Sequence, residues 1–272
     1  MFTAETIPLR HWLVPGLAVG LGLWLLTSRG PGDHTLSVAD DSTPDADKPF
    51  AVVELFTSQG CSSCPPADRN LRRLAESART TGTRLFALSF HVDYWNRLGW
   101  TDPHSRPEFS ARQSAYARAF QTEGVYTPQM VVNGTVEFVG SDVDRSDKAI
   151  AAALRRPPSG VRLTVRTNVT TTPDHAVKVD YTTLGTTPDD DLHVALVRSS
   201  ASNPVPRGEN AGRTLHHVHV VATLTTISRP RAHGEVSLHL PGDAKPQDFA
   251  VIAFVQNAKT RAIRAATEQP VR

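Results

Sequence analysis

Two cysteines three positions apart, Cys61 and Cys64, are the only thiols in the 272 residues. They follow an apolar run and precede a helical pattern, an arrangement typical of a redox-active dithiol. A disulfide-stabilised extracellular scaffold would use several scattered cysteines, and a structural zinc site would need two further ligands. The pair therefore predicts thiol–disulfide chemistry, which requires no dissociable cofactor.

This chemistry depends on a thiolate, because only the anion attacks a disulfide. At the start of a helix, Cys61 would lie near unpaired N–H groups and the positive end of the helix dipole. In C-x-x-C motifs the first thiol has its pKa lowered from about 8.5 to roughly 3.5–7.5. Ser62 and Ser63 would add donors that favour the thiolate. We expect Cys61 to be reachable by reagents and Cys64 to resolve the mixed disulfide.

Three polar residues could assist the pair. Glu54 lies within the apolar run, and burial would raise its pKa, so that it could shuttle the proton of Cys64. His91 and Asp93 alternate at the end of a strand and would share a face. They could assist proton transfer or form a structural contact. Alternatively, His91 could join both cysteines in binding Cu(I), which prefers soft thiolate ligands.

Further polar and aromatic groups lie outside the motif. Of the histidines at 216, 217 and 219, only His217 and His219 would share a strand face, and no acidic or cysteine ligand lies nearby in sequence. We therefore expect no metal site there. Near position 210 a polar loop would cap the domain that carries the cysteines or contact a partner; it contains Glu209, Asn210 and Arg213. Aromatic residues could line a groove or pack, namely Tyr94, Trp95 and Trp100.

Strand and helix patterns alternate around the cysteines. An apolar run at 50–56 predicts a buried strand, and Pro65 and Pro66 suit the first turn of a helix that Gly82 ends. Because strand and helix alternate, the strand at 84–91 should be parallel to the first. Next come a helix including 109–120, a hairpin at Asn133-Gly134 and a helix at 144–156.

The pattern changes after residue 160. Alternating apolar and polar stretches, separated by turn residues, occur at 161–169, 175–184, 192–199, 215–227, 235–240 and 249–256. Long helical periods are absent from this part of the sequence. We therefore predict a second, all-β domain of the sandwich type, with a boundary at about 157–160.

The N-terminus resembles an export signal. Arg10 and His11 precede an apolar run at 12–26, which is short for a membrane span but suits a signal peptide. Residues 1–30 are therefore predicted to be a signal peptide or an N-terminal membrane anchor, and 31–48 a linker. We expect a periplasmic or extracellular protein in an oxidising compartment. If the N-terminal segment is kept as an anchor, the protein would be tethered to the inner membrane.

Composition limits the remaining classes. Apolar residues make up 39% and charged residues 21%, and the formal net charge is only +2. These values indicate a folded protein rather than a disordered chain. Basic residues form no stripe, so we expect no nucleic-acid partner.

The element order from 50 to 156 is similar to the thioredoxin fold with an insertion at 93–122. Several segments resemble a family of secreted bacterial thioredoxin-like proteins classed as a domain of unknown function: 54–68, 90–95, 98–103, 126–130 and 208–214. The resemblance implies a thioredoxin-like domain at 49–157 and a C-terminal β domain at 158–272. It also implies that Cys61 attacks, that Cys64 resolves, and that Pro128 has a cis peptide bond beside them.

In that arrangement the backbone of Thr127 would pair with an extended substrate. The sequence departs from thioredoxin in having Ser-Ser between its cysteines and Gly60 before them, and Glu54 is one position away from the thioredoxin acid. We expect an exported thiol–disulfide oxidoreductase acting on protein or small thiol substrates, with a redox partner that resets the dithiol. The alternatives are a Cu(I)-handling protein and a non-catalytic binding module with a stable disulfide.

Overall fold

The computed structural model describes residues 48–170, 175–242 and 244–272. The predictions of a signal peptide or anchor at 1–30 and of a linker at 31–48 therefore fall almost wholly outside the described residues. Within the described ranges, no helix is long and apolar enough to cross a membrane.

The first part of the chain follows the predicted alternation of strand and helix. Its elements are β1 (Ala51–Thr57), α1 (Pro65–Thr81), β2 (Leu85–His91), a short 3₁₀ helix (Asn96–Leu98), α2 (Pro107–Phe120), β3 (Gln129–Val132), β4 (Val136–Val139) and α3 (Val143–Ala153). As predicted, α1 begins at Pro65. The missing N–H of proline costs no helix hydrogen bond there, because N–H groups of the first turn have no partner within the helix. Gly82, with φ of +68°, ends it in the left-handed conformation.

The second part is made of strands, with one further 3₁₀ turn (Pro246–Asp248). The strands are β5 (Arg162–Thr170), β6 (Ala176–Leu184), β7 (Asp190–Val205), β8 (Arg213–Ser228), β9 (His233–His239), β10 (Phe249–Asn257) and β11 (Ile263–Pro270). At 16 residues each, β7 and β8 are longer than the sequence pattern predicted. The last strand, β11, was not predicted.

The strands form a mixed sheet of eight and a second sheet of three. The large sheet has the order β11-β10-β7-β8-β2-β1-β3-β4, and the small one β5-β6-β9. As predicted, β1 and β2 are parallel. Between α3 and β5 lies the predicted domain boundary, but the large sheet continues across it because β8 pairs in parallel with β2 at Ser89 and Val220.

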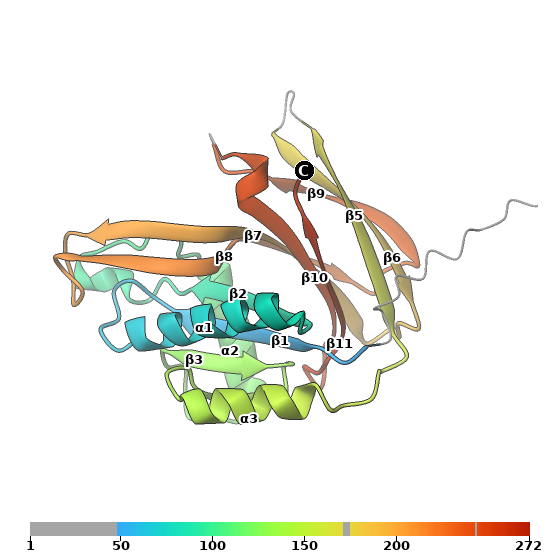
Figure 1. Ribbon diagram of the computed structural model, residues 1–272, viewed down its shortest axis with the longest axis horizontal. Coiled ribbons are helices and arrows are strands. Elements are labelled where there is room, and N and C mark those ends of the chain that lie inside the picture. The colour runs from blue at the N-terminus through green and yellow to red at the C-terminus, as the bar shows by residue number, and fades with distance from the viewer. Residues whose placement is uncertain (1–47, 171–174, 243) are drawn as a thin grey trace, which may run out of the picture. The chain divides into compact units, whose positions relative to one another are not determined.

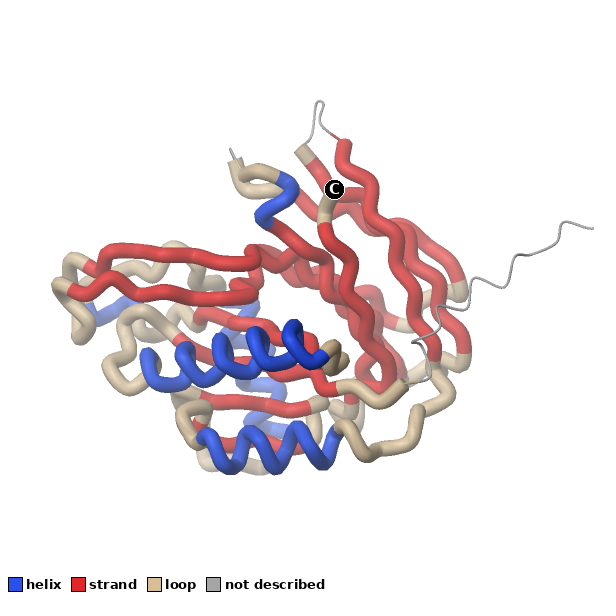
Figure 2. Tube along the Cα trace, viewed as in Figure 1, coloured by secondary structure: helices blue, strands red, loops and turns tan. Residues whose placement is uncertain are grey.

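Three apolar clusters stabilise this arrangement. One joins β1 and β3 to α1 and α3, and a second joins β1, β2 and β10 to α2. Figure 1 shows α1 and α3 on the near side of these strands and α2 behind them. The third cluster packs the small sheet against β7, β10 and β11, which gives the sandwich expected for the second part. Strands dominate this second part in Figure 2.

The predicted Asn133-Gly134 turn connects β3 to β4. Both residues have positive φ angles, +47° and +67°. The Asn133 side chain accepts a hydrogen bond from Val52 N at 2.6 Å and donates one to Phe50 O at 3.1 Å. A Cβ atom at Gly134 would overlap the carbonyl oxygen of Arg261 in the turn between β10 and β11. Only glycine therefore fits this position.

We predict that Gly134→Ala destabilises the protein more than Gly82→Ala does. The two glycines have nearly equal φ angles, but a Cβ atom at Gly82 would meet nothing within 4 Å. The Gly82 variant should lose about 1–2 kcal/mol of unfolding free energy, the usual cost of a left-handed alanine. Urea denaturation of both variants measures the difference. Equal losses would show that the contact with Arg261 does not constrain the turn.

Candidate functional site

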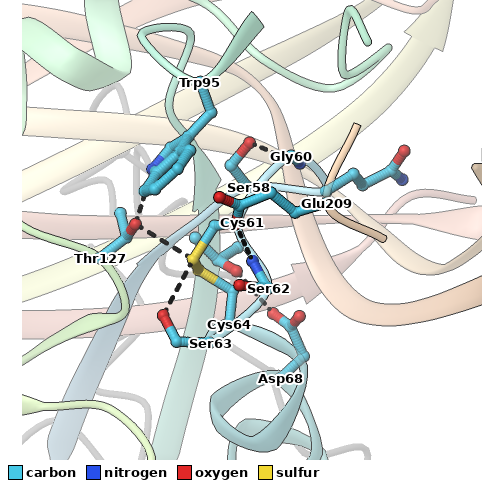
Figure 3. The surroundings of a disulfide bond; sticks show 12 residues. Ser58, Gly60, Cys61, Ser62, Ser63, Cys64, Asp68, Trp95, Thr127 and Glu209 are labelled. Carbon is cyan, nitrogen blue, oxygen red and sulfur yellow. Dashed lines mark hydrogen bonds between the residues drawn. A yellow bond between two sulfur atoms is a disulfide. The ribbon is translucent and has the colours of Figure 1, made fainter. Parts of the chain in front are cut away.

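The C-x-x-C loop lies between the end of β1 and the start of α1. Cys61 and Cys64 form a disulfide, and Cys64 is the residue immediately before the helix. Neither cysteine has any exposed surface, whereas Ser62 and Ser63 between them are exposed. The expectation that Cys61 is reachable is therefore wrong for this closed, oxidised state. Figure 3 shows side chains from distant segments around the two sulfur atoms.

Two hydroxyl groups lie beside the sulfur of Cys61. Thr127 Oγ1 donates to Cys61 Sγ at 3.4 Å, and Ser63 Oγ lies 3.3 Å from the same sulfur. The indole of Trp95 donates to Thr127 Oγ1 at 2.8 Å. Since an indole can only donate, this contact leaves the Thr127 hydrogen free to point at the sulfur. Such a donor would stabilise a thiolate on Cys61.

The peptide bond between Thr127 and Pro128 is cis, as predicted. It lies directly before β3, and Pro128 is buried while Thr127 is half-buried. The structure therefore brings Thr127 to the cysteines, as the sequence prediction required.

The β7–β8 hairpin covers the C-x-x-C loop with its connection, residues 206–212, here called the capping loop. Asn210 is fully buried, and its amide nitrogen donates to the carbonyl oxygens of Gln59 and Cys61, both at 2.9 Å. Arg213 Nη1 donates to Asn210 Oδ1 at 2.8 Å and holds the amide in this orientation. The expectation that this polar loop caps the domain that carries the cysteines is confirmed, and the structure places the cap on the C-x-x-C loop.

Glu209, next to Asn210, changes the predicted role of Ser62. The exposed carboxylate of Glu209 accepts a hydrogen bond from Ser62 N at 2.9 Å. This bond and a second one from the Ser62 side chain lower the pKa of Glu209. In the closed state, the N–H group that was expected to favour the Cys61 thiolate therefore binds a carboxylate from the capping loop instead.

His91 binds Asp102 and does not pair with Asp93. Its Nδ1 atom lies 2.7 Å from Asp102 Oδ2, and both side chains are fully buried. Asp93 lies beyond the end of β2, where it accepts a hydrogen bond from Ser110. The expected His91–Asp93 pair is wrong because the strand alternation stops at His91.

Asp102 also receives two backbone hydrogen bonds, from Gln59 N at 2.8 Å and His104 N at 2.9 Å. Burial raises the pKa of Asp102, but His91 and these donors lower it by more than burial raises it. The pKa therefore lies well below its ordinary value. Burial lowers the pKa of His91, but Asp102 and then Asp68 raise it to above 6.5. For His104, burial and then the charge of His91 lower the pKa to about 4.

Glu54 is buried, as expected, but it lies in a different network. Arg112 donates to its carboxylate at 2.6 and 3.0 Å, and Tyr116 donates a further hydrogen bond. Gln256 extends the network from β10. These partners occupy Glu54, and neither cysteine is among its hydrogen-bond partners in the described part of the chain. Its predicted role as proton shuttle is therefore not supported by its position.

The two histidines expected on one face of β8 have different surroundings. The ring of His217 is buried 4.6 Å from that of His91. His219 has a φ of +49°, which interrupts the alternation, and it lines a separate cavity of about 560 Å³ near Arg79 and Glu268. Across residues 48–170, 175–242 and 244–272, no three His, Cys, Asp or Glu side chains are arranged to hold a metal. The alternative Cu(I) set of Cys61, Cys64 and His91 is thus not assembled.

Sequence reasoning did not single out Asp68 and Asp102. Asp68 lies four residues after Cys64 in α1 and is buried beneath the disulfide loop. Helical spacing could have identified it, because residues i and i+4 lie on one face. No local signal identifies Asp102 as the partner of His91, because His91 ends β2 whereas Asp102 comes from the irregular segment after it.

We predict that Asn210→Ala speeds reduction of the disulfide. The substitution removes two hydrogen bonds that hold the capping loop closed, each with a net stabilisation of about 1 kcal/mol. The reduction rate should therefore rise on the order of tenfold. Thiol labelling during treatment with a phosphine reductant measures this rate. Arg207→Ala, at an exposed position of the same loop, is the control. Equal rates in both variants would contradict the capping role.

The Asp102–His91 pair predicts a pH-dependent stability difference between the wild type and Asp102→Asn. The carboxylate contribution is present above about pH 4 and is lost as the pH falls. The imidazole contribution is present below about pH 6.5 and is lost as the pH rises through the raised pKa of His91. Between about pH 4 and 6.5, the unfolding free energy of the variant should therefore be about 2–3 kcal/mol lower than that of the wild type, and the difference should be smaller on either side.

Urea denaturation across pH 3–9 tests this prediction, with Asp93→Asn as the control. A difference that stays constant over this range would show that the pair carries no net ionic stabilisation.

Comparisons with known proteins agree with the fold. The family model "Protein of unknown function (DUF1223)" matches residues 52–256. A crystal structure of an Agrobacterium tumefaciens protein, a structural-genomics target, is 30% identical and has a TM-score of 0.59. The match covers 83% of this chain and 96% of that one.

A domain of the outer membrane lipoprotein Omp28 from Porphyromonas gingivalis is 11% identical, with a TM-score of 0.25. The match covers 43% of this chain and 91% of that one. No curated protein matches the chain. Because the family model spans most of the sequence, the chain belongs to the DUF1223 family of proteins of unknown function.

Proposed function

We propose that this protein is an exported thiol–disulfide oxidoreductase whose reactive pair is Cys61 and Cys64. The observation that carries the proposal is the C-x-x-C disulfide before the first turn of α1, with the Thr127 hydroxyl donating to Cys61 Sγ at 3.4 Å. A thiolate formed there by reduction would be stabilised by this hydroxyl and by the start of the helix. Cys61 would attack a client disulfide, and Cys64 would resolve the mixed disulfide.

The arrangement around the pair supports a thioredoxin-like unit at 49–157. In it, α1 follows the cysteines, β2 lies parallel to β1, and β3 and β4 form an antiparallel hairpin on the other side of β1. Two helices cover one face of these strands and α2 the other. The insertion predicted at 93–122 would then supply α2 and the loop that carries Asp102.

In this proposal the capping loop must move away before a client can reach Cys61. The loop is held mainly by polar contacts from Glu209 and Asn210, each of which contributes modestly. Export would place the dithiol in an oxidising compartment, where a separate redox partner would reset it. The chemistry itself needs no cofactor.

The second candidate is a non-catalytic binding module with a stable disulfide. Complete burial of both cysteines favours this reading, because a structural disulfide needs no access to solvent. The two candidates differ in redox potential, since structural disulfides generally lie below about −300 mV. Catalytic pairs lie at roughly −270 to −120 mV.

We predict that the isolated protein reduces insulin or oxidises a dithiol peptide, and that Cys61→Ser abolishes the activity. Cys64→Ser should instead accumulate a mixed disulfide through Cys61, because no resolving thiol remains. Non-reducing electrophoresis and mass spectrometry detect this adduct. A midpoint potential above about −300 mV is also expected.

Two results would reject the enzymatic proposal in favour of the binding module. One is a potential well below that value, and the other is a wild-type protein without activity in either direction. If activity is found, the measured potential indicates whether the protein donates or accepts electrons.

A further inference from the structure

Asp68 lies about one helical turn after Cys64, on the same face of α1. The two residues are four positions apart, and Asp68 N donates to Cys64 O at 3.1 Å. Side chains in a helix lean toward its N-terminus, so the carboxylate of Asp68 lies over the turn that contains Cys64. Figure 3 shows this carboxylate pointing from α1 toward the C-x-x-C loop. Asp68 is only 5% exposed.

Two donors face the same oxygen of Asp68. Thr57 at the end of β1 donates its hydroxyl to Asp68 Oδ1 at 2.9 Å. His217 of β8 places Nδ1 3.6 Å from the same atom, slightly beyond hydrogen-bond distance. That buried Nδ1 has no hydrogen-bond partner in the described part of the structure. Thr57 is therefore hydrogen-bonded to this carboxylate oxygen, and His217 lies close enough to bind it after a small movement.

The direction of these hydrogen bonds follows from Trp100. Its indole, which can only donate, binds Gln59 Oε1 at 3.1 Å. This contact assigns the Gln59 oxygen and turns its amide nitrogen toward Asn203 Oδ1 and His217 Nε2, at 3.2 and 3.4 Å. His217 Nε2 must then accept, so the ring proton lies on Nδ1 and faces Asp68. This series of polar contacts leads from the Trp100 indole through Gln59 and His217 to Asp68, which is the acceptor.

A small cavity connects Asp68 to the surface. Its volume is about 130 Å³, and it lies between α1 and β8. Besides Asp68 it is lined by Arg69, Arg72, Arg213 and His216. Water in this cavity could exchange a proton with the carboxylate. On the side away from this cavity, Asp68 faces the buried side chains of His91, Asp102 and His217.

We propose that Asp68 is the base that takes the proton of the Cys64 thiol, and that His217 positions it. This inference rests on the proposed dithiol function. In a mixed disulfide between Cys61 and a client, the Cys64 proton moves to the Asp68 carboxylate as Cys64 Sγ attacks Cys61 Sγ. The new Cys61–Cys64 bond forms while the Cys61–client S–S bond breaks. Its electron pair leaves with the client sulfur, and Asp68 returns its proton through the cavity.

The electron balance follows from these bonds. The protein dithiol loses two electrons to become the disulfide, and the client disulfide gains them to become two thiols. The role of base goes to Asp68 rather than Glu54, because Glu54 is bound by Arg112 and Tyr116.

Other charged or titratable groups surround Asp68 and His217. They are His91 from β2, Asp102 and His104 from the loop after it, Arg69 and Arg72 from α1, and Arg213 and His216 from β8.

The test measures resolution of a preformed mixed disulfide in Asp68→Asn. Reaction of the reduced full-length protein with Ellman's reagent forms the adduct on Cys61, and stopped-flow absorbance follows release of the second thionitrobenzoate. We expect release in the variant to be about 10²-fold slower at pH 7, the usual contribution of a general base. Its rate should also rise tenfold per pH unit, because attack then requires the free Cys64 thiolate, whereas the wild-type rate should depend less steeply on pH.

Glu76→Gln, which changes an exposed carboxylate on the same helix, is the control and should match the wild type. If Asp68→Asn does not fold, His217→Gln decides. We expect its release rate to fall and to depend more steeply on pH than that of the wild type, because Asp68 loses its partner. A wild-type rate and pH profile in Asp68→Asn, or in His217→Gln, would overturn the assignment.

The resolution step is intramolecular, so it can be measured without a protein client. Asp68-dependent resolution in a protein that neither reduces insulin nor oxidises dithiols would reject the oxidoreductase proposal alone. Client turnover with Asp68-independent resolution would reject the base assignment alone.

Discussion

The parallel pairing between β2 and β8 is the constraint on which the site depends. It aligns Val220 with Ser89 near the end of β2 that leads into the site. The β7–β8 hairpin therefore extends past the end of the strand, and its tip reaches the C-x-x-C loop through Asn210. The same alignment carries His217 to Asp68. A shift of one residue would turn these side chains to the opposite face of the sheet.

The two sulfur atoms have different environments even though they belong to one disulfide. Cys61 faces hydroxyl donors, and one of them, Thr127, is oriented by the donor-only indole of Trp95. Cys64 is followed along its helix face by the carboxylate of Asp68, toward which Gln59 and His217 direct a chain of donors. Donors favour a thiolate, whereas a nearby carboxylate favours a thiol that can lose its proton only on demand. Opposite roles for the two cysteines are consistent with this asymmetry.

Burial of the disulfide reflects how the capping loop is attached. An apolar lid over the sulfur atoms would be stabilised by each methylene group that it removes from water. The capping loop instead uses the amide of Asn210 and the exposed carboxylate of Glu209. Net contributions of such polar contacts are small, because water replaces them when the loop opens. Polar attachment would therefore combine the closed state with a low cost of the opening that the proposed function requires.

The sequence determined the elements around the cysteines, because their signals are local. Pro65 and Gly82 mark the ends of α1, Asn133-Gly134 marks a turn, and the spacing of Cys61 and Cys64 predicts their disulfide. Which distant groups meet at the pair follows from the three-dimensional packing. Asp102 replaces Asp93 as the partner of His91, and Arg112 binds Glu54 away from the cysteines. These partners are set by sheet order and loop paths, which depend on packing across the whole chain rather than on any local pattern.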